Sequence, residues 1–157
     1  MRCVCIIGHR KIAEDKLGYV REQLQCEVEK AIEDGFTTFL CGMADGVDLE
    51  FGAIVAAKKK THPGLFLEAV IPYTGRAETE NPMFKEVLAQ CDGTTVLSRE
   101  YHPDCYYNRN RYLVEYSQRV IAVFDGNEKS GTAQTMRLAA EAKRDLRVID
   151  ISGSVAE

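Results

Sequence analysis

Residues 37–58 read TTFLCGMADGVDLEFGAIVAAK. The apolar run Phe39–Cys41 predicts a strand, and Gly42 and Gly46 predict a turn directly after it. From Val47 onward the apolar residues recur with helical spacing. A strand, a glycine turn and a helix bring backbone N–H groups to the carboxyl edge of a parallel sheet, where ligands bind in open α/β folds. This stretch therefore indicates both the fold class and a binding edge.

The same alternation recurs along the chain. The continuous apolar run at 3–7 is typical of a strand buried on both faces of a parallel sheet. Further strands are expected at 65–71, 94–97, 120–124 and 146–151, helices at 15–33, 83–90, 106–118 and 132–143, loops at 74–80 and 98–105, and a frayed tail at 152–157. We therefore predict a three-layer, Rossmann-like α/β fold, a single domain over 1–157, with a mostly parallel sheet of about six strands and helices on both faces.

Composition narrows the class of protein. The 157 residues carry a formal net charge of −4, which argues against a broad nucleic-acid-binding surface. Six cysteines include no C-x-x-C pair, so we interpret them as reduced core residues and predict no metal site. No signal-like segment stands at the start, and no apolar run approaches the roughly 20 residues of a membrane span. A soluble, cytoplasmic protein without a membrane partner is the prediction.

Gly8, His9 and Arg10 directly follow the first strand. A glycine at a strand end lets a ligand approach the backbone, and Arg10 is suited to hold a phosphate or a carboxylate. The alternative is a plain turn with a solvated histidine and arginine. We favour the ligand-binding interpretation because all three residues lie at the edge where ligands bind in this architecture.

The turn after the second strand carries two carboxylates. Asp45 and Asp48 have the spacing of a helix N-cap and its third-position partner, which is the structural alternative. As ligand contacts they suit ribose hydroxyls or an amine better than a bare phosphate. The candidate binding residues of this turn are Gly42, Met43, Ala44, Asp45, Gly46 and Asp48.

The clearest phosphate-binding signal precedes the last helix. Asp125 and Gly126 mark the end of a strand, and Ser130, Gly131 and Thr132 begin the helix. Two hydroxyls and exposed N–H donors at a helix N-terminus favour an anion, and the first turns of this helix contain no acidic residue. A simple serine or threonine N-cap is the alternative. We expect a phosphate here rather than at the helix that starts near Val47.

Two further candidates lie elsewhere on the chain. Arg109 and Asn110 fall in the helix expected at 106–118, where they suit a ligand or subunit contact, or a basic surface patch. Tyr73 follows the third strand and is suited either to stacking on a base or to packing.

These motifs resemble a known group. The segment Gly42-x-Ala44-x-Gly46-x-Asp48 is similar to one in DNA-processing protein A, and Ser130-Gly131-Thr132 after Asp125-Gly126 resembles the phosphate loop of the LOG proteins. Both belong to the SLOG superfamily, and the order of motifs across most of the chain looks like its small YpsA-like branch. The resemblance implies a Rossmann-like fold that binds a nucleotide or a nucleotide-derived ligand, often as a homo-oligomer.

The resemblance leaves catalysis open. LOG enzymes cleave the N-glycosidic bond of nucleoside monophosphates with an arginine and a glutamate, and Thr135 stands where that glutamate would be. The favoured hypothesis is a sensor or regulatory protein for an ADP-ribose-like ligand or a mononucleotide, with no required cofactor. The alternative is a phosphoribohydrolase-like enzyme with Asp45, Asp48, Asp125 or His9 as acid or base. A single-stranded DNA accessory protein is disfavoured by the acidic composition.

Overall fold

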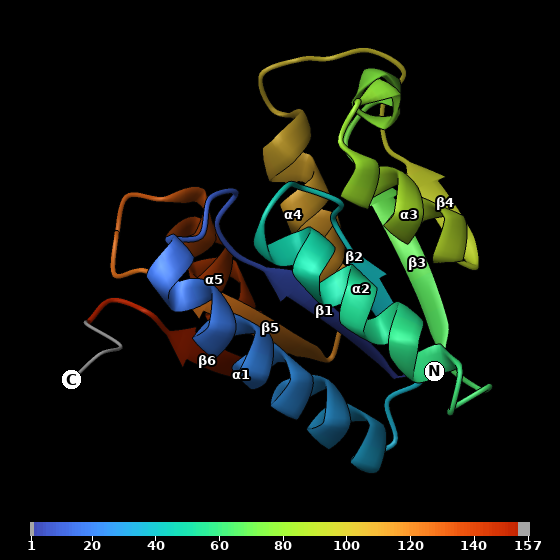
Figure 1. The fold of residues 1–157 in the computed structure, drawn as a ribbon. Helices are drawn as coiled ribbons and strands as arrows, with labels where there is room; N and C mark the ends of the chain where they lie inside the picture. The colour runs from blue at the N-terminus through green and yellow to red at the C-terminus, as the bar shows by residue number, and fades with distance from the viewer. Residues whose placement is uncertain (1, 154–157) are drawn as a thin grey trace.

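The computed structural model describes residues 2–153, which form a six-stranded parallel sheet covered by helices (Figure 1). The strands are β1 (Cys3–Ile7), β2 (Thr38–Cys41), β3 (Phe66–Ile71), β4 (Gly93–Val96), β5 (Arg119–Phe124) and β6 (Asp145–Asp150). The helices are α1 (Glu14–Glu33), α2 (Val47–Lys59), α3 (Pro82–Gln90), α4 (Cys105–Tyr116), α5 (Gly131–Glu141) and the short 3-10 helix η1 (Thr74–Glu78). The predicted Rossmann-like α/β class is confirmed, and all strand pairs are parallel.

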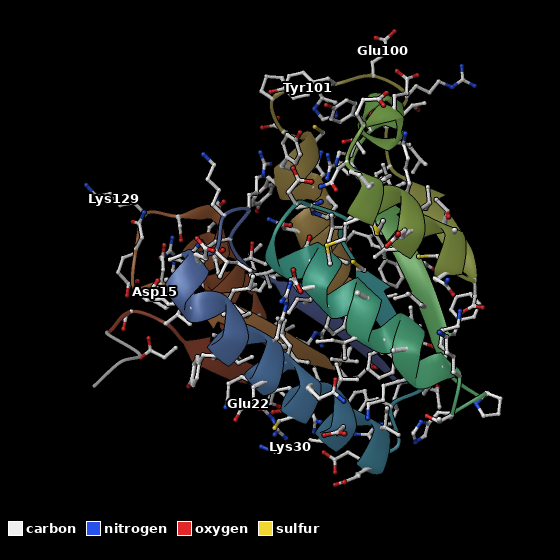
Figure 2. All side chains as sticks on the ribbon, viewed as in Figure 1. Asp15, Glu22, Lys30, Glu100, Tyr101 and Lys129 are labelled. Carbon is white, nitrogen blue, oxygen red and sulfur yellow. The ribbon has the colours of Figure 1, made fainter. Side chains whose placement is uncertain are left out.

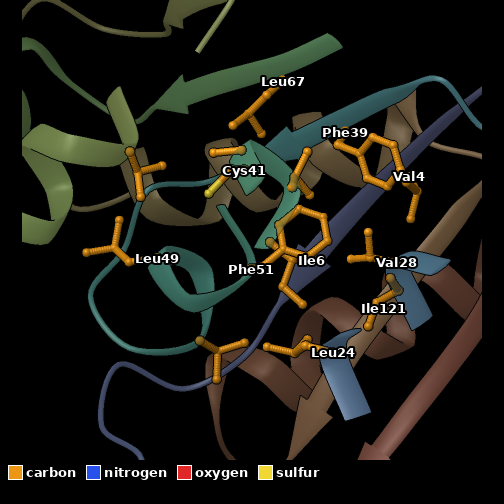
Figure 3. Packing of buried hydrophobic residues seen from close by; sticks show 14 of the residues in the cluster. Val4, Ile6, Leu24, Val28, Phe39, Cys41, Leu49, Phe51, Leu67 and Ile121 are labelled. Carbon is orange, nitrogen blue, oxygen red and sulfur yellow. The ribbon is translucent and has the colours of Figure 1, made fainter. Parts of the chain in front are cut away.

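Two apolar cores separate the three layers. Val4 and Ile6 of β1 point into the core formed with α1, α2 and α3, and Cys5 and Ile7 point into the core formed with α4 and α5. The first core includes Phe39 and Phe51, whose ring centroids lie 6.2 Å apart (Figure 3). Because successive side chains of a strand point to opposite faces, a continuously apolar β1 serves both cores.

The strand order places a crevice at the end of β1. The order is β4-β3-β2-β1-β5-β6, so the chain builds outward from β1 to β4 and then returns to place β5 on the other side of β1. In open α/β sheets the point where the order reverses leaves a crevice at the carboxyl ends of the two strands. In this protein that point lies between β1 and β5.

Most element boundaries agree with the predicted ones within two residues, but one segment differs in kind. Residues 74–78, expected as part of a loop, form η1. Helix α4 ends at Tyr116 rather than at 118, because the N–H of Gln118 already donates to the carbonyl of Cys3 as the chain enters β5. The part of the expected frayed tail at 154–157 lies outside the described residues.

The cysteines are not all core residues, so that expectation is wrong in part. Cys5, Cys41 and Cys105 are buried, whereas Cys26 is exposed on α1. The helical face of α1 that enters the core carries Val20, Leu24 and Val28, and residue 26 lies on the other side of the helix. Within residues 2–153, no helix has the length and apolarity needed to cross a bilayer.

Candidate functional site

A cavity of about 290 Å³ lies at the carboxyl end of β1 and the start of α5. Gly8, His9 and Arg10 form the part of its lining that follows β1. A Cβ on Gly8 would lie 2.6 Å from Cγ1 of Val47, so a glycine is required for α2 to approach this closely. The cavity thus lies at the crevice that the strand order defines.

The turn after β2 is locked against the turn after β1. Gly46 has φ 83° and ψ −124°, and a Cβ there would lie 2.5 Å from the carbonyl oxygen of Arg10. The N–H of Val47 donates to the carbonyl of His9 at 3.1 Å. Gly46 is also the N-cap residue of α2 and Asp45 makes no cap hydrogen bond, so the capping role considered for Asp45 is wrong.

Asp48 and Ala44 form the floor of the cavity on the α2 side. Oδ2 of Asp48 accepts a 3.1 Å hydrogen bond from the N–H of Ala44. Asp48 is 5% exposed, and burial raises the pKa of its carboxyl to about 6, although Arg109 opposes that rise. A carboxyl that titrates near neutral pH inside a cavity is chemically suited to accept or donate a proton.

Arg109 extends from α4 into the same cavity. Its Nη1 donates to the carbonyl of Gly42 at 2.6 Å, and its Nε donates to Oδ1 of Asn110 at 2.8 Å. Its side chain is buried, and this burial lowers the pKa of the guanidinium. Within residues 2–153, Nη2 makes no hydrogen bond, so this buried cation retains a donor for a ligand.

The start of α5 forms the opposite part of the lining, through Gly131, Thr132 and Thr135. Ser130 is the N-cap residue, and its Oγ accepts from the N–H of Ala133. The N–H groups of Gly131 and Thr132 precede the helical hydrogen bonds and stay available for an anion. No atom lies within 4 Å of the position of a Cβ on Gly131, so the backbone is open there.

His9 connects this helix start to the end of β5. Its Nε2 accepts a 3.0 Å hydrogen bond from the N–H of Asp125 and lies 3.3 Å from Oδ1 of the same residue. Its Nδ1 lies 3.5 Å from Oγ1 of Thr132. With Nε2 as the acceptor, the proton of a neutral ring is on Nδ1, which orients the imidazole between the two segments.

The structure brings most of the predicted site residues together. The cavity lining includes Gly8, His9, Arg10, Ala44, Asp48, Arg109, Asn110, Gly131 and Thr132. Asp45 lies beside it, in a smaller adjoining pocket. Thus Gly8 and Gly131 face one cavity, and Gly46 packs against the backbone of Arg10, which lines that cavity.

Other residues predicted to bind the ligand do not line the cavity and make structural contacts instead. The side chain of Met43 is fully buried in the core at a φ of 62°, and Gly42 and Gly46 act through their backbone. Gly126, at φ 91°, packs against Ser152. Asp125 and Ser130 contact His9 and the first turn of α5.

Tyr73 belongs to an aromatic group rather than to the lining. Its ring lies 5.4 Å from that of Tyr101 and 6.2 Å from that of Tyr106, both edge-on. Figure 2 shows Tyr101 on the exposed loop before α4. Tyr106 lines the cavity, and the sequence motifs did not identify it.

Arg76 of η1 was also missed, because it lies in a segment predicted as a polar loop. Its Nη2 donates to the carbonyl of Met43 at 2.7 Å and to Oδ1 of Asp45 at 2.9 Å. Asn81 donates to the same Asp45 oxygen. These contacts lower the pKa of Asp45, so its carboxylate is ionised near neutral pH. Within residues 2–153, no cluster of three or more His, Cys, Asp or Glu residues has metal-binding geometry.

The fold and the cavity define a Rossmann-like protein with its pocket at the topological switch point. Residues 6–152 match the model of the YspA SLOG family, and the chain belongs to that family. The UPF0398 protein BH1768 of Halalkalibacterium halodurans is 23% identical over 141 residues, which are 83% of this chain and 75% of that protein.

Two solved structures resemble the fold. DNA processing protein A from Helicobacter pylori superposes with a TM-score of 0.69 at 20% identity, over 94% of this chain and 64% of that one. This chain therefore spans less than two thirds of that protein. The Moco carrier protein of Chlamydomonas reinhardtii superposes with a TM-score of 0.54 at 17% identity, over 99% of this chain and 95% of that chain. At these identities the likeness concerns the fold.

Proposed function

We propose that the protein binds a nucleotide or a nucleotide-derived ligand in the cavity, with its phosphate at the start of α5, in a sensor or regulatory role. One observation carries the proposal: Arg10, Arg109 and the N-terminus of α5 line the same space. Arginine side chains and free backbone N–H groups at a helix start are the donors that bind phosphate. The first turn of α5 contains no acidic residue that would oppose an anion.

The residues around the proposed phosphate position are also suited to bind the sugar and the base of a nucleotide. The carboxyl of Asp48 and the amide of Asn110 supply acceptors for hydroxyl groups, and Tyr106 supplies an aromatic surface. Among proteins with this fold, DNA processing protein A from Helicobacter pylori binds single-stranded DNA, and the protein from Chlamydomonas reinhardtii carries the molybdenum cofactor. A ligand-binding role for this chain is consistent with both.

Thermal unfolding against a panel of nucleotides tests the proposal. A ligand at 100 times its dissociation constant adds about 2.7 kcal/mol, which is about 5–10 °C in Tm for a domain of this size. The variant Arg10→Gln is expected to lose most of the shift, since Arg10 lines the cavity. Arg111→Gln removes the same charge from an exposed side chain paired with Glu115, and should keep it. No shift with any nucleotide would contradict the proposal.

The pKa of Asp48 supports a second candidate, hydrolysis of an N-glycosidic bond. A buried carboxyl with a pKa of about 6 is suited to protonate a leaving base or to activate water. Release of free base from nucleoside monophosphates, lost in Asp48→Asn, would support this candidate. Turnover that survives in Asp48→Asn would exclude Asp48 from the reaction.

The homo-oligomer and the cytoplasmic location stay predictions. Light scattering after gel filtration measures the oligomeric state.

A further inference from the structure

A second, smaller pocket adjoins the cavity between η1 and the start of α4. Its volume is about 60 Å³, and its lining consists of Arg10, Ala44, Asp45, Arg76, Tyr106 and Arg109. Arg10, Tyr106 and Arg109 also line the larger cavity, so the two spaces share a wall. A single water needs about 10–15 Å³ on this measure, so the pocket has room for a larger group.

Arg76 is held in place before any ligand arrives. Its Nε and Nη2 donate to the carbonyl of Met43, its Nη2 donates to Asp45, and its guanidinium carbon lies 4.8 Å from the ring centroid of Phe84. In residues 2–153, no hydrogen bond is made by Nη1 of Arg76. A fixed guanidinium with a free donor binds an anion with little loss of side-chain freedom.

Arg10 and Arg109 meet at one aromatic ring. Their guanidinium carbons lie 4.5 Å and 5.8 Å from the ring centroid of Tyr106. Arg10 forms no ion pair with the carboxylates of residues 2–153. The nearby charge of Arg10 adds to burial in lowering the pKa of Arg109, as expected when two cations are held close together.

The charges around the small pocket do not balance. Three guanidinium groups line it, against two carboxylates: Asp45, which is already bonded to Arg76 and Asn81, and Asp48, which lies across the shared wall and attracts the same arginines. An anion entering the pocket would relieve the repulsion among the arginines and use their free donors. This excess of positive charge is separate from the start of α5, which is not part of the lining.

We propose that the small pocket binds a second anionic group of the same ligand, so that the ligand is a nucleotide carrying two phosphates. The inference rests on the proposed function, because it places the first phosphate at α5 and the second among Arg10, Arg76 and Arg109. It decides between the two ligand classes left open by the sequence, a mononucleotide with one phosphate and an ADP-ribose-like ligand with two.

Calorimetric titration of the full chain with four adenine nucleotides tests the inference. AMP carries one phosphate, ADP and ADP-ribose carry a pyrophosphate, and adenosine 3′,5′-bisphosphate carries two separate phosphates. We expect at least one two-phosphate compound to bind about tenfold more tightly than AMP, since charge-assisted hydrogen bonds add at least this much. The compound whose affinity exceeds that of AMP shows whether the two phosphates bind as a pyrophosphate or as separate groups.

The variant Arg76→Gln separates an anion contact from a structural effect. It should remove most of the gain of the two-phosphate compound and leave AMP within about twofold, because Arg76 lines only the small pocket. Arg111→Gln, the matched control on the exposed side of α4, should preserve the gain.

Three outcomes would overturn the inference. Equal loss of AMP and of the two-phosphate compound in Arg76→Gln would mean that Arg76 only supports the turn at Met43. Equal affinity of the wild-type protein for AMP and for all three other compounds would contradict a second phosphate site in the small pocket but leave the proposed function intact. Absence of binding by every nucleotide would remove the proposed function as well.

Discussion

Nη1 of Arg109 donates a 2.6 Å hydrogen bond to the carbonyl oxygen of Gly42, and this bond joins α4 to the turn after β2. The two residues are 67 positions apart in the chain, and the bond between them is buried. Gly42 itself has no room for a side chain, since a Cβ would lie 2.9 Å from Oδ2 of Asp48 and 3.0 Å from Cδ of Arg109. This contact holds the side chain of Arg109 where it lines the cavity.

Replacing Arg109 with methionine is expected to destabilise the fold. The change leaves the carbonyl of Gly42 without its partner and removes the positive charge that most opposes the rise in the pKa of Asp48. We expect a loss of about 2–4 kcal/mol in the free energy of unfolding at pH 8, measured by urea denaturation. The loss should shrink below pH 6, where Asp48 is protonated. A loss no larger than that of Arg111→Met would contradict this account.

Asp48→Asn should change how stability depends on pH. The folded pKa of Asp48, about 6, lies above its ordinary value of 3.8, so the folded state binds the proton more tightly than the unfolded state. This contribution is fully present below pH 3.8 and is lost as pH rises through 6, and the complete loss is about 3 kcal/mol. Asparagine lacks the titration, so the variant should gain stability relative to wild type between pH 4 and pH 8. A difference that stays constant over this range would disprove the assignment.

Gly46→Ala and Gly18→Ala should have opposite effects. The first places a Cβ 2.5 Å from the carbonyl of Arg10 at a φ of 83°, and should destabilise the protein by about 2–4 kcal/mol. The second lies inside α1 with no atom within 4 Å, and should stabilise it by about 0.5–1 kcal/mol. Thermal unfolding of both variants measures the contrast. Similar effects from the two changes would show that the turn at Gly46 tolerates a side chain.

Cys26 should be the first cysteine to react with iodoacetamide in the native protein. It is exposed on α1, whereas Cys5 and Cys41 are buried and burial raises the pKa of both thiols, to about 12 for Cys5. A high thiol pKa leaves little of the reactive thiolate. Peptide mass spectrometry after brief labelling should find the label at Cys26, and all six sites after unfolding. Early labelling of Cys5 would indicate that the sheet opens readily.

The sequence predicted the order of elements because buried parallel strands have an unmistakable pattern. The run at Cys3–Ile7 is apolar on both faces, and β1 does contribute to both cores. The glycine turn was also predictable, since Gly46 is required by its φ and by the nearby carbonyl of Arg10. The candidate residues at strand ends therefore came together, as parallel topology demands.

The arginines of the small pocket were harder to predict, because their positions depend on contacts distant in sequence. Arg76 lies in η1, whose polar sequence resembles a loop, and only its bonds to Met43 and Asp45 reveal its orientation. The spacing of Asp45 and Asp48 suggested a helix cap, but the carboxylate of Asp45 accepts a hydrogen bond from Arg76 instead of capping the helix. No sequence motif includes Tyr106. Its place in the site is evident only from the guanidinium groups of Arg10 and Arg109, which lie beside its ring.

The most direct test of the account is a calorimetric titration of the wild-type protein and of Gly131→Trp with the best nucleotide of the panel. Gly131 lines the cavity at the start of α5, and no atom lies within 4 Å of its Cβ position, so an indole can be added there without a clash and is expected to crowd the N–H groups that we assign to the phosphate. We expect saturable binding to the wild-type protein and none to Gly131→Trp, with similar Tm values for the two unliganded proteins. Equal binding to both, or no nucleotide binding to the wild-type protein, would contradict it.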